Sequence, residues 1–474
     1  MKIIIILRND KAFFCLNTQN KMRIIIMKYT KRVLFSLSLA ASLALGANAS
    51  SLAKDTTKSE ITKQVLILEA YANIALDNYT EALNDAKLLQ DAIDKFVEKP
   101  TQKNLDNAKK AWLQSRESYG STEIFRLSNG PIDAEDGWIA DTYGALEGQI
   151  NAWPLDENMI DYTIDADGNR TSGNIIDTIG KFNPGGEDSS EVDVTKITVE
   201  ALTELNENGG EANVSTGYHA IEFLLWGQDQ DYNNFLEDNI TKGAMKAGQR
   251  PLSDFTTDKN KDRRLQYLKA VTQKLVEDLE VVKSAWNRDI KGDSGLYRAA
   301  FLGKLKNSDK NLDKSESLKQ IISGMGVFIK SELANERLAV AVLTPSEEDE
   351  HSCFSDNTHR DLVKNYEGFK NILTSTYNGK KYGESLFDAL EKEDKDRILK
   401  LMKSIEAKIE QVDKVAKTEA HFDYQIRPDH KMSRVLVSLK NELRKLGDEM
   451  ITVARANSIN LSTDDVTDPE ETKI

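Results

Sequence analysis

Cysteine and proline are scarce in this sequence of 474 residues, and basic residues are fewer than acidic ones. The eight prolines, set against many helix-forming residues, disfavour the short strands and Pro/Gly turns of β-sandwiches and indicate an all-α protein. The 63 Lys and Arg residues are outnumbered by 77 Asp and Glu, which gives a net charge of −14. Because nucleic-acid phosphates are bound by clustered Lys and Arg, the composition excludes nucleic-acid binding.

The N-terminal segment has the three parts of a secretory signal peptide. After Met27, basic residues stand at 28, 31 and 32, an apolar core covers 33–45, and an Ala-Asn-Ala cleavage site covers 47–49. The core of about 13 residues is shorter than the roughly 20 that span a bilayer, which argues against a membrane anchor. We therefore expect residues 27–49 to be a signal peptide and residues 1–26 to be a start-site extension.

Export would leave a chain with one cysteine. Cys15 precedes the expected cleavage site, so Cys353 remains and an internal disulfide is excluded. Nearly all the charged residues that cleavage removes are basic, so the mature chain is more acidic than the full sequence. No cysteine stands beside the cleavage site, so a bacterial lipoprotein anchor is not expected. The predicted location is the periplasm or the cell envelope, with no lipobox cysteine.

Four segments repeat apolar residues at alternating steps of three and four, which is the spacing of one helix face. They cover residues 61–96, 265–286, 398–416 and 432–453. Each such face must be buried against other helices, as in a helical bundle. Weaker helical patterns cover residues 102–127, 195–207, 215–226, 313–342 and 359–375.

Two stretches lack this helical spacing. Residues 128–192 are rich in Gly, Asp, Asn and Pro, and a loop region of that length is usually functional or carries short elements of its own. The polar residues 227–260 are the expected domain boundary. The sequence therefore predicts an all-α fold with helical-bundle domains at 55–240 and 250–460, followed by a disordered tail at 461–474.

The most informative motif is Gly217-x-His219-x-x-Glu222, which we call the GxHxxE motif. Residues three apart share a helix face, so the imidazole and the carboxylate can point at one metal ion. A carboxylate in this apolar segment needs a partner, which can be a metal, Arg116 or Arg126. Gly217 leaves room for the close approach of another backbone or a ligand. The alternative is a buried hydrogen bond between His219 and Glu222 that joins two helices.

A second candidate region is the polar segment 346–361. It holds His351, Cys353, Asp356 and His359 among several other acidic residues. Imidazole, thiolate and carboxylate are all ligands of transition metals. The alternative is an acidic, solvated loop that leads into the next helix, with Cys353 as a small packed side chain.

A third candidate region ends the helix expected over 102–127 at an Asn-Gly-Pro turn. Arg116, Glu123 and Arg126 share this helix with aromatic residues, and Asp133 follows the turn. Salt bridges within the bundle are the alternative explanation for these charges.

Several enzyme signatures are missing from the chain. The sequence contains no His-Glu-x-x-His zinc-protease motif, no Gly-x-Ser-x-Gly elbow, no phosphate-binding Gly loop that ends in Lys-Ser/Thr, and no dinucleotide fingerprint. The Asp-rich run at 165–169 lacks the Gly and Glu positions of an EF-hand and predicts a tight turn instead.

Three segments together resemble the imelysin-like family, and in particular its iron-regulated protein A branch. Residues 217–227 (GYHAIEFLLWG) carry the GxHxxE motif of that family, and residues 116–133 resemble its other long motif, which ends in Asn-Gly-Pro-Ile-Asp. Residues 348–359 (EDEHSCFSDNTH) resemble the iron-regulated protein A branch. The resemblance covers residues 60–455.

The resemblance implies two bundle-like domains with a pocket at their interface, an export signal and a role in iron acquisition. The family was grouped as metallopeptidases around the GxHxxE motif. A related domain occurs in the periplasmic component of a bacterial ferrous-iron transport system, which implies a membrane transport partner. Many relatives are lipid-anchored, whereas this chain lacks the cysteine for such an anchor.

Two hypotheses follow. In the first, His219 and Glu222 bind a metal ion, expected to be iron, or a small metal-bearing ligand. The further ligand-binding residues would be Arg116, Glu123, Arg126, Asp133, His351, Asp356 and His359. In the second, the chain is a zinc-dependent peptidase in which a carboxylate activates water. The motif supplies two ligands, fewer than the three of a catalytic zinc site, and acidic surroundings suit iron, so the first hypothesis is favoured.

Overall fold

The computed structural model describes residues 49–165, 167–229, 245–343 and 350–468. The expected start-site extension and signal peptide lie outside these residues except for Ala49, so export stays a prediction. Contacts group residues 58–474 into one unit and residues 1–57 into another, and the expected domain boundary near residue 250 stays a prediction. None of the helices in the described ranges is both long and apolar enough to cross a membrane.

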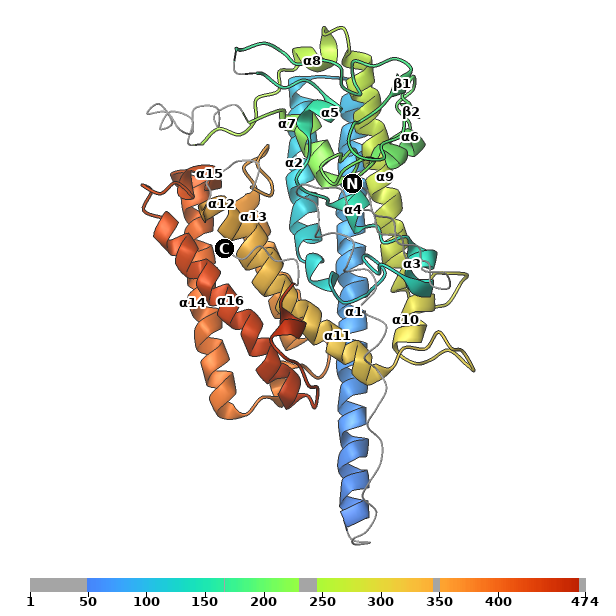
Figure 1. Cartoon of the computed structure of the whole chain (residues 1–474), viewed down its shortest axis with the longest axis vertical. Coiled ribbons are helices and arrows are strands. Elements are labelled where there is room, and N and C mark those ends of the chain that lie inside the picture. The colour runs from blue at the N-terminus through green and yellow to red at the C-terminus, as the bar shows by residue number, and fades with distance from the viewer. Residues whose placement is uncertain (1–48, 166, 230–244, 344–349, 469–474) are drawn as a thin grey trace, which may run out of the picture. The chain divides into compact units, whose positions relative to one another are not determined.

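The fold is all-α, as the sequence predicts (Figure 1). The long helices are α1 (Ala49–Glu98), α2 (Gln102–Gly120), α9 (Lys261–Ala285), α11 (Lys314–Val327), α13 (Thr358–Thr374), α14 (Lys392–Thr418) and α16 (Ser433–Ala456). The short helices are α3 (Gly137–Tyr143), α4 (Glu147–Ile150), α5 (Glu157–Ile160), α6 (Val199–Leu205), α7 (Gly217–Trp226), α8 (Ser253–Thr256), α10 (Leu296–Phe301), α12 (Val340–Leu343) and α15 (Phe422–Gln425). Short helical segments of other types are η2 (Glu123–Phe125), η5 (Phe328–Ala339), η6 (Phe387–Ala389) and η7 (Asp464–Val466). Two antiparallel pairs of short strands join β1 (Lys181–Phe182) to β2 (Val192–Asp193) and β3 (Thr376–Tyr377) to β4 (Lys380–Lys381).

The four strongest apolar repeats all form helices, namely α1, α9, α14 and α16. Their apolar faces are buried, and in α16 the side chains of Leu436, Leu439 and Leu443 are fully covered. Burial of a leucine side chain contributes about 1.5–3 kcal/mol, so these faces supply much of the driving force for folding. Thr101 caps α2 by accepting a hydrogen bond from the backbone N–H of Asn104, which fixes where that helix begins.

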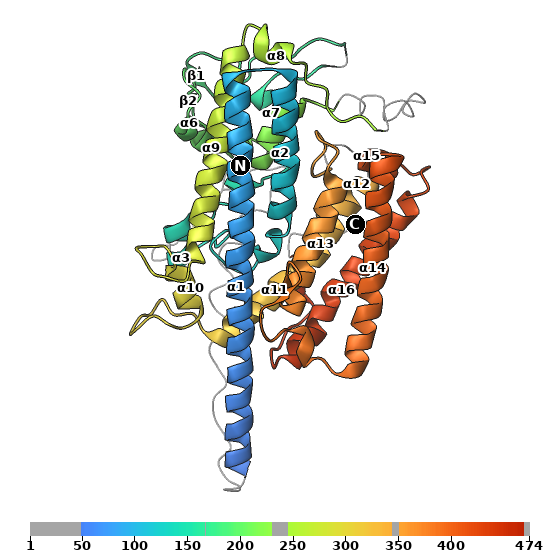
Figure 2. The same ribbon diagram turned by 180° about the vertical axis from the view of Figure 1, so that it is seen from behind.

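The helices pack in two groups (Figures 1 and 2). Helix α7 packs on α2 and α9, and α16 packs on α11, η5 and α14. Helix α13 contacts both α2 and α14, so it connects the two groups. The segment just before α13 lies next to α7, the helix that carries the GxHxxE motif, because Ser355 bonds to Glu222.

Helix α2 ends earlier than the expected helix over 102–127. It stops at Gly120, where a side chain would meet Lys364 of α13, since an added Cβ would lie 2.8 Å from the Lys364 Cβ. The chain then forms η2 and a turn in which Leu127 and Asn129 have positive φ angles. Helix α13 therefore packs closely on the end of α2, and η2 and the following turn stand where the last two turns of the expected helix would be.

The expected helix over 313–342 is continuous in space but changes type. It begins as α11, becomes the π-helical segment η5 and ends as α12. A π-helix bonds residues five apart, so side chains at i and i+5 share one face. Glu332 and Arg337 accordingly form an ion pair at 2.9 Å within η5.

The expected loop region over 128–192 carries short elements, namely α3, α4, α5, β1 and β2. A buried ion pair fastens it to α9, because the Asp161 carboxylate accepts hydrogen bonds at 2.6 and 3.0 Å from Arg264. The tail was expected to be disordered from residue 461, but it packs on the rest of the protein as far as Asp468. Val466 of η7 is fully buried, and the backbone N–H of Asp468 donates to the Ser331 hydroxyl of η5.

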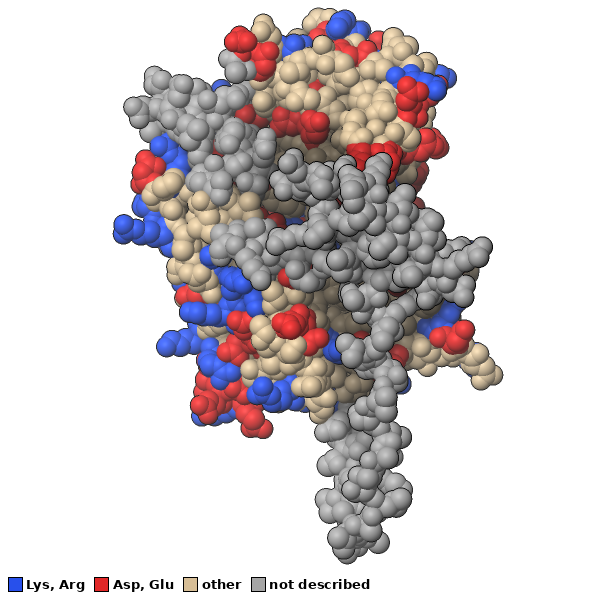
Figure 3. Space-filling model, in the orientation of Figure 1, with Lys and Arg blue, Asp and Glu red and all other residues tan. Residues whose placement is uncertain are grey.

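Charged side chains of both signs share the surface. On the face shown in Figure 3, Lys and Arg gather mainly over α14 and α16, where they alternate with Asp and Glu. Several of these charges form ion pairs, such as Arg397 of α14 with Glu449 of α16 at 2.7 Å. Exposed pairs of this kind contribute at most about 1 kcal/mol each, so the buried charges described next matter more for stability.

Candidate functional site

Gly217, the first residue of the GxHxxE motif, allows two backbone segments to touch. Its φ angle is +82°, and an added Cβ would lie 2.5 Å from the carbonyl oxygen of Ile150 at the end of α4. The predicted close approach is thus made by another backbone. Every residue of α7 is buried, so the motif lies inside the protein.

Glu222 and His219 form a hydrogen-bonded pair in the core. The His219 Nδ1 lies 2.9 Å from the Glu222 Oε2, and both side chains are fully buried. The other carboxylate oxygen of Glu222 accepts hydrogen bonds from the Ser355 backbone N–H at 3.0 Å and from its hydroxyl at 2.6 Å. The hydrogen-bond partners of Glu222 are therefore His219 and Ser355, in place of the expected Arg116 or Arg126.

The second ring nitrogen of His219 has no hydrogen-bond partner. This buried Nε2 belongs to a ring that packs against Trp153 and His351, at centroid distances of 4.9 and 4.7 Å. Burial lowers the pKa of His219 well below its usual value, and the nearby His351 and Arg116 lower it further. The imidazole is therefore neutral at neutral pH and can present a lone pair, as metal-ligating histidines do.

His351 belongs to a buried charge network behind the motif. Its Nδ1 lies 2.9 Å from Asp361, which also accepts a hydrogen bond from Arg116 at 2.8 Å. Burial lowers the pKa of His351, and Arg337, 3.5 Å from its Nε2, lowers it further. Two neutral imidazoles, from segments far apart in the sequence, thus lie face to edge in the core.

Arg116, Glu123 and Arg126 take part in the same network. Arg116 also donates to Asn151 at 2.6 Å, and Glu123 pairs with Arg337 at 2.5 Å. Arg126 forms ion pairs at 3.3 Å with Glu147 and at 3.2 Å with Glu332. These charges mainly satisfy one another, as the salt-bridge interpretation of the sequence proposed.

A cavity of about 290 Å³ opens beside this network. Its lining includes His351, Trp153, two arginines and five glutamates. The charged members are Arg126, Arg337, Glu147, Glu207, Glu211, Glu332 and Glu336. Because His351 and Trp153 also pack on the His219 ring, the motif lies directly behind the inner wall of the cavity.

The cavity has an excess of acidic groups, and their pKa values reflect it. Burial raises the pKa of Glu207, and the charge of Glu211 raises it further. Burial and the charge of Glu332 raise the pKa of Glu336, although Asn335 opposes the shift. Burial alone would raise the pKa of Glu332, but Arg126 and Arg337 hold it at about 2. A cation would relieve the repulsion between these carboxylates.

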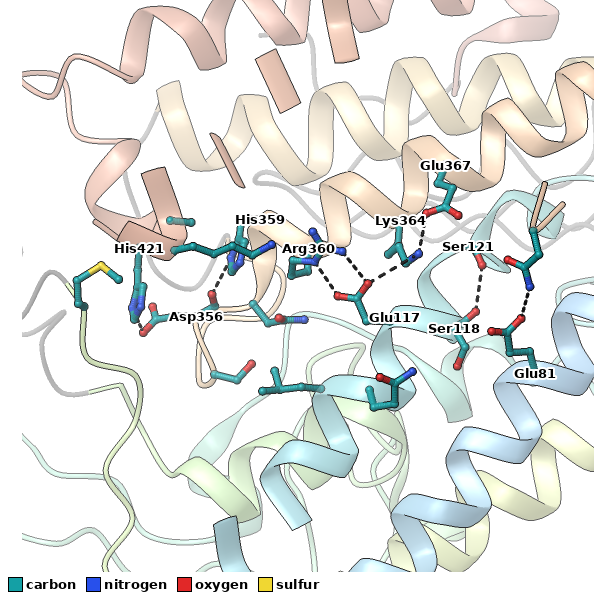
Figure 4. A pocket seen from close by; sticks show the side chains of 18 of the residues that line it. Glu81, Glu117, Ser118, Ser121, Asp356, His359, Arg360, Lys364, Glu367 and His421 are labelled. Carbon is teal, nitrogen blue, oxygen red and sulfur yellow. Dashed lines mark hydrogen bonds and ion pairs between the residues drawn. The ribbon is translucent and has the colours of Figure 1, made fainter. Parts of the chain in front are cut away.

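Three of the predicted residues, Asp133, Asp356 and His359, do not line this cavity. Asp133 accepts a hydrogen bond from the backbone N–H of Leu127 and closes the turn after α2, and burial raises its pKa to about 6. Asp356 and His359 line a second cavity of about 700 Å³ (Figure 4). Burial lowers the pKa of His359 to about 4, and its Nδ1 lies 3.0 Å from the Asp356 carbonyl oxygen. Of the nine predicted residues, Arg126 and His351 line the smaller cavity, Asp356 and His359 line the larger one, and the other five line neither of the two.

Several residues of the site carry no sequence signal that points to it. Trp153 and Asn151 lie in the irregular region before α5, and Glu332 and Arg337 lie in η5. Ser355 and Asp361 stand in or beside the polar segment 346–361, but their spacing shows no periodicity. The close charge pair of Glu332 and Arg337, five residues apart, is recognisable only once the π-helical backbone is known.

The pKa of Glu222 gives a prediction about stability. Burial raises it from 4.5 to about 8, although the Ser355 hydrogen bonds oppose the shift. Between these pH values the Glu222 carboxyl is ionised in the unfolded chain and protonated in the folded protein. Its contribution to the free energy of unfolding therefore falls as pH rises. Glu222→Gln keeps a donor for His219 and an acceptor for Ser355 without the ionisation.

We expect Glu222→Gln to gain stability over the wild type as pH rises through this window. The gain is at most about 1.4 kcal/mol per pH unit. Urea unfolding of metal-free protein at pH 5, 6, 7 and 8 measures it. A difference between the two proteins that stays constant with pH would contradict the assigned environment of Glu222.

Comparison with known proteins gives a match to a family model, a match to a curated protein and matches to solved structures. A family model described as Imelysin matches residues 75–450. The curated Iron-regulated protein A of Synechococcus elongatus is 27% identical over 101 residues, which are 21% of this chain and 25% of that protein. The matched part thus spans a quarter of that relative.

One of the matching solved structures is a crystal structure described as that of an iron-regulated protein A precursor from Parabacteroides distasonis. It superposes with a TM-score of 0.52 at 16% identity, over 83% of this chain and 95% of that one. At this identity the match concerns the fold alone.

Proposed function

This chain belongs to the imelysin family, and on that premise we propose that it is an exported protein that binds a metal ion, or a small ligand carrying one, and takes part in iron acquisition. The observation that carries the proposal is the His219 Nε2, a buried ring nitrogen without a hydrogen-bond partner. An unsatisfied buried polar atom costs about 1–3 kcal/mol, so a neutral imidazole in this state needs an explanation. A bound metal supplies one.

Glu222 is assigned a positioning role. A metal-ligating histidine usually gives its other ring N–H to a carboxylate, which fixes the ring and its tautomer. Glu222 stands at that place, and Ser355 holds it there by two hydrogen bonds. In the metal-free protein the protonated Glu222 donates to Nδ1, and the ring proton is on Nε2. Metal binding would release the Nε2 proton and draw the shared proton to Nδ1, which frees the Nε2 lone pair of His219. We therefore assign His219 as a ligand and Glu222 as the residue that orients it, where the sequence suggested two ligands.

The cavity supports a positively charged occupant. His351 of its wall is a second neutral imidazole, and carboxylates outnumber guanidinium groups in the lining. Nitrogen and carboxylate oxygen together suit iron and other divalent transition metals. The Synechococcus and Parabacteroides relatives are both named as iron-regulated proteins, which favours iron as the metal. A membrane transport protein is the proposed partner in uptake.

A zinc-dependent peptidase remains the alternative, and no observation favours it. Such an enzyme uses three protein ligands and a carboxylate that accepts a proton from water. The motif carboxylate, Glu222, is already engaged by His219 and Ser355. In the described ranges, the ligand atoms of three His, Cys, Asp or Glu residues come within 4.8 Å of one another at Asp229, Asp356 and Asp423, not at the motif.

Removal of the His219 imidazole should weaken metal binding at least tenfold while the fold persists. Isothermal titration of anaerobic, chelator-treated protein with Fe²⁺, and separately with Zn²⁺, measures this for wild type and His219→Ala. His430→Ala is the matched control, because His430 lines neither cavity. Circular dichroism establishes that each variant is folded. Equal affinity of wild type and folded His219→Ala for both metals would refute the proposal.

A further inference from the structure

A second group of buried acidic residues includes one member of the segment that leads into α13. Ligand oxygens of Asp229, Asp356 and Asp423 all lie within 4.8 Å of one another, and the three residues are 3–4% exposed. They come from three places: the residues just after α7, the segment before α13, and α15. Three carboxylates at this separation, out of water, repel one another unless protons or a cation intervene.

A fourth carboxylate, that of Glu350, lies near this group, although it is not one of the three whose ligand oxygens lie within 4.8 Å of one another. Glu350 is fully buried, and neither of its carboxylate oxygens has a hydrogen-bond partner. Burial raises its pKa well above the usual range, and Asp356 and Asp229 are among the neighbours whose charges raise it further. The same holds for Asp423, whose pKa is raised by burial, by Asp356 and by Glu350. One oxygen of Asp423 is also without a partner.

From this arrangement we propose that Asp229, Asp356 and Asp423 form a binding site for one hard divalent cation of the size of Ca²⁺, with the charge of Glu350 beside it. The donors are all oxygen, which suits Ca²⁺ and Mn²⁺ better than soft metals. Ca²⁺ holds oxygens at about 2.3–2.6 Å, so ligands on opposite sides are roughly 5 Å apart. The separation of at most 4.8 Å among the three Asp oxygens fits that diameter.

The site has a route to solvent. Asp356 and His421 lie together at one end of the larger cavity, away from Glu81 and Ser121 (Figure 4). His421 also forms an ion pair with Asp356. A cation that enters this cavity therefore reaches Asp356 first, and His421 orients that carboxylate.

The same segment serves both sites with neighbouring residues. Asp356 belongs to the three-aspartate site and Glu350 lies beside it, while His351 packs on His219 and Ser355 bonds to Glu222. The cation would thus hold the segment that positions the GxHxxE motif. Its ligands are different residues from those proposed at His219, so either proposal can fail without the other.

Titration of chelator-treated protein with Ca²⁺, and separately with Mn²⁺, tests the site by calorimetry and by the melting temperature. We expect one cation per chain and a higher melting temperature on binding. Asp423→Asn should weaken binding at least tenfold and remove the thermal shift. Without metal, this variant should melt no lower than the wild type, because it relieves repulsion between buried carboxylates.

Two control variants separate this site from others. Asp262→Asn changes a side chain that is 88% exposed and should leave Ca²⁺ binding unchanged. His219→Ala should also leave it unchanged, whatever that variant does to iron binding. Absence of Ca²⁺ and Mn²⁺ binding by the wild type at millimolar concentration would overturn the inference and indicate that the carboxylates share protons. Unaltered binding by Asp423→Asn would overturn it as well.

Discussion

Replacement of Arg116 by methionine should lower the free energy of unfolding by about 3–5 kcal/mol, the usual cost of removing one partner from a buried ion pair. Arg116 is 1% exposed and donates to Asp361 at 2.8 Å and to Asn151 at 2.6 Å. Burial alone would raise the pKa of Asp361, but Arg116 and His351 hold it well below its usual range. Methionine fills similar space without compensating the Asp361 charge.

The matched control for Arg116→Met is Arg397→Met. Arg397 also forms two ion pairs, with Asp394 and Glu449, but its side chain is 46% exposed. Water replaces the lost partner there, so the loss should stay within about 1 kcal/mol. Urea unfolding at pH 7 measures both variants. Losses of similar size would show that the Arg116 network contributes no more than a surface pair.

Gly217→Ala should destabilise the protein by about 2–5 kcal/mol for two separate reasons. A left-handed backbone costs a residue with a side chain about 1–2 kcal/mol. The new Cβ would also collide with the Ile150 carbonyl oxygen at 2.5 Å, and overpacking of this kind costs about 1–3 kcal/mol. Since α7 must move to relieve the collision, we also expect the environment of His219 to change.

Gly292→Ala isolates the backbone part of that cost. Gly292 has a φ angle of +62°, but an added Cβ would meet no atom within 4 Å. This control should therefore lose only the cost of the left-handed backbone. Thermal or urea unfolding compares the two variants. If Gly217→Ala is no less stable than Gly292→Ala, the contact between α4 and α7 is not tight.

The helices could be predicted from the sequence because their signal is local. In α16, Leu436, Leu439 and Leu443 follow one another at steps of three and four, and the same spacing buries them in the structure. The π-helical form of η5 could not be predicted in this way, since its residues also satisfy an ordinary helical pattern. The difference matters because it sets Glu332 beside Arg337 at the cavity.

The candidate site could be predicted only in part, because its contacts join distant segments. The motif placed His219 and Glu222 on one helix face, and they are indeed hydrogen-bonded. The Ser355 contacts to Glu222 join residues 133 apart, and no spacing rule connects them. The cluster of Asp229, Asp356 and Asp423 likewise forms only when the fold brings α15 close to the residues that follow α7.

The most direct test of the central claim locates the metal in crystals. Crystals of the mature protein would be soaked anaerobically in Fe²⁺, and anomalous diffraction recorded at the iron edge. Our account predicts an anomalous peak at ligand distance from the Nε2 of His219, absent in crystals of His219→Ala. An iron peak confined to other residues, or no peak at all with His219 in its native position, would contradict it.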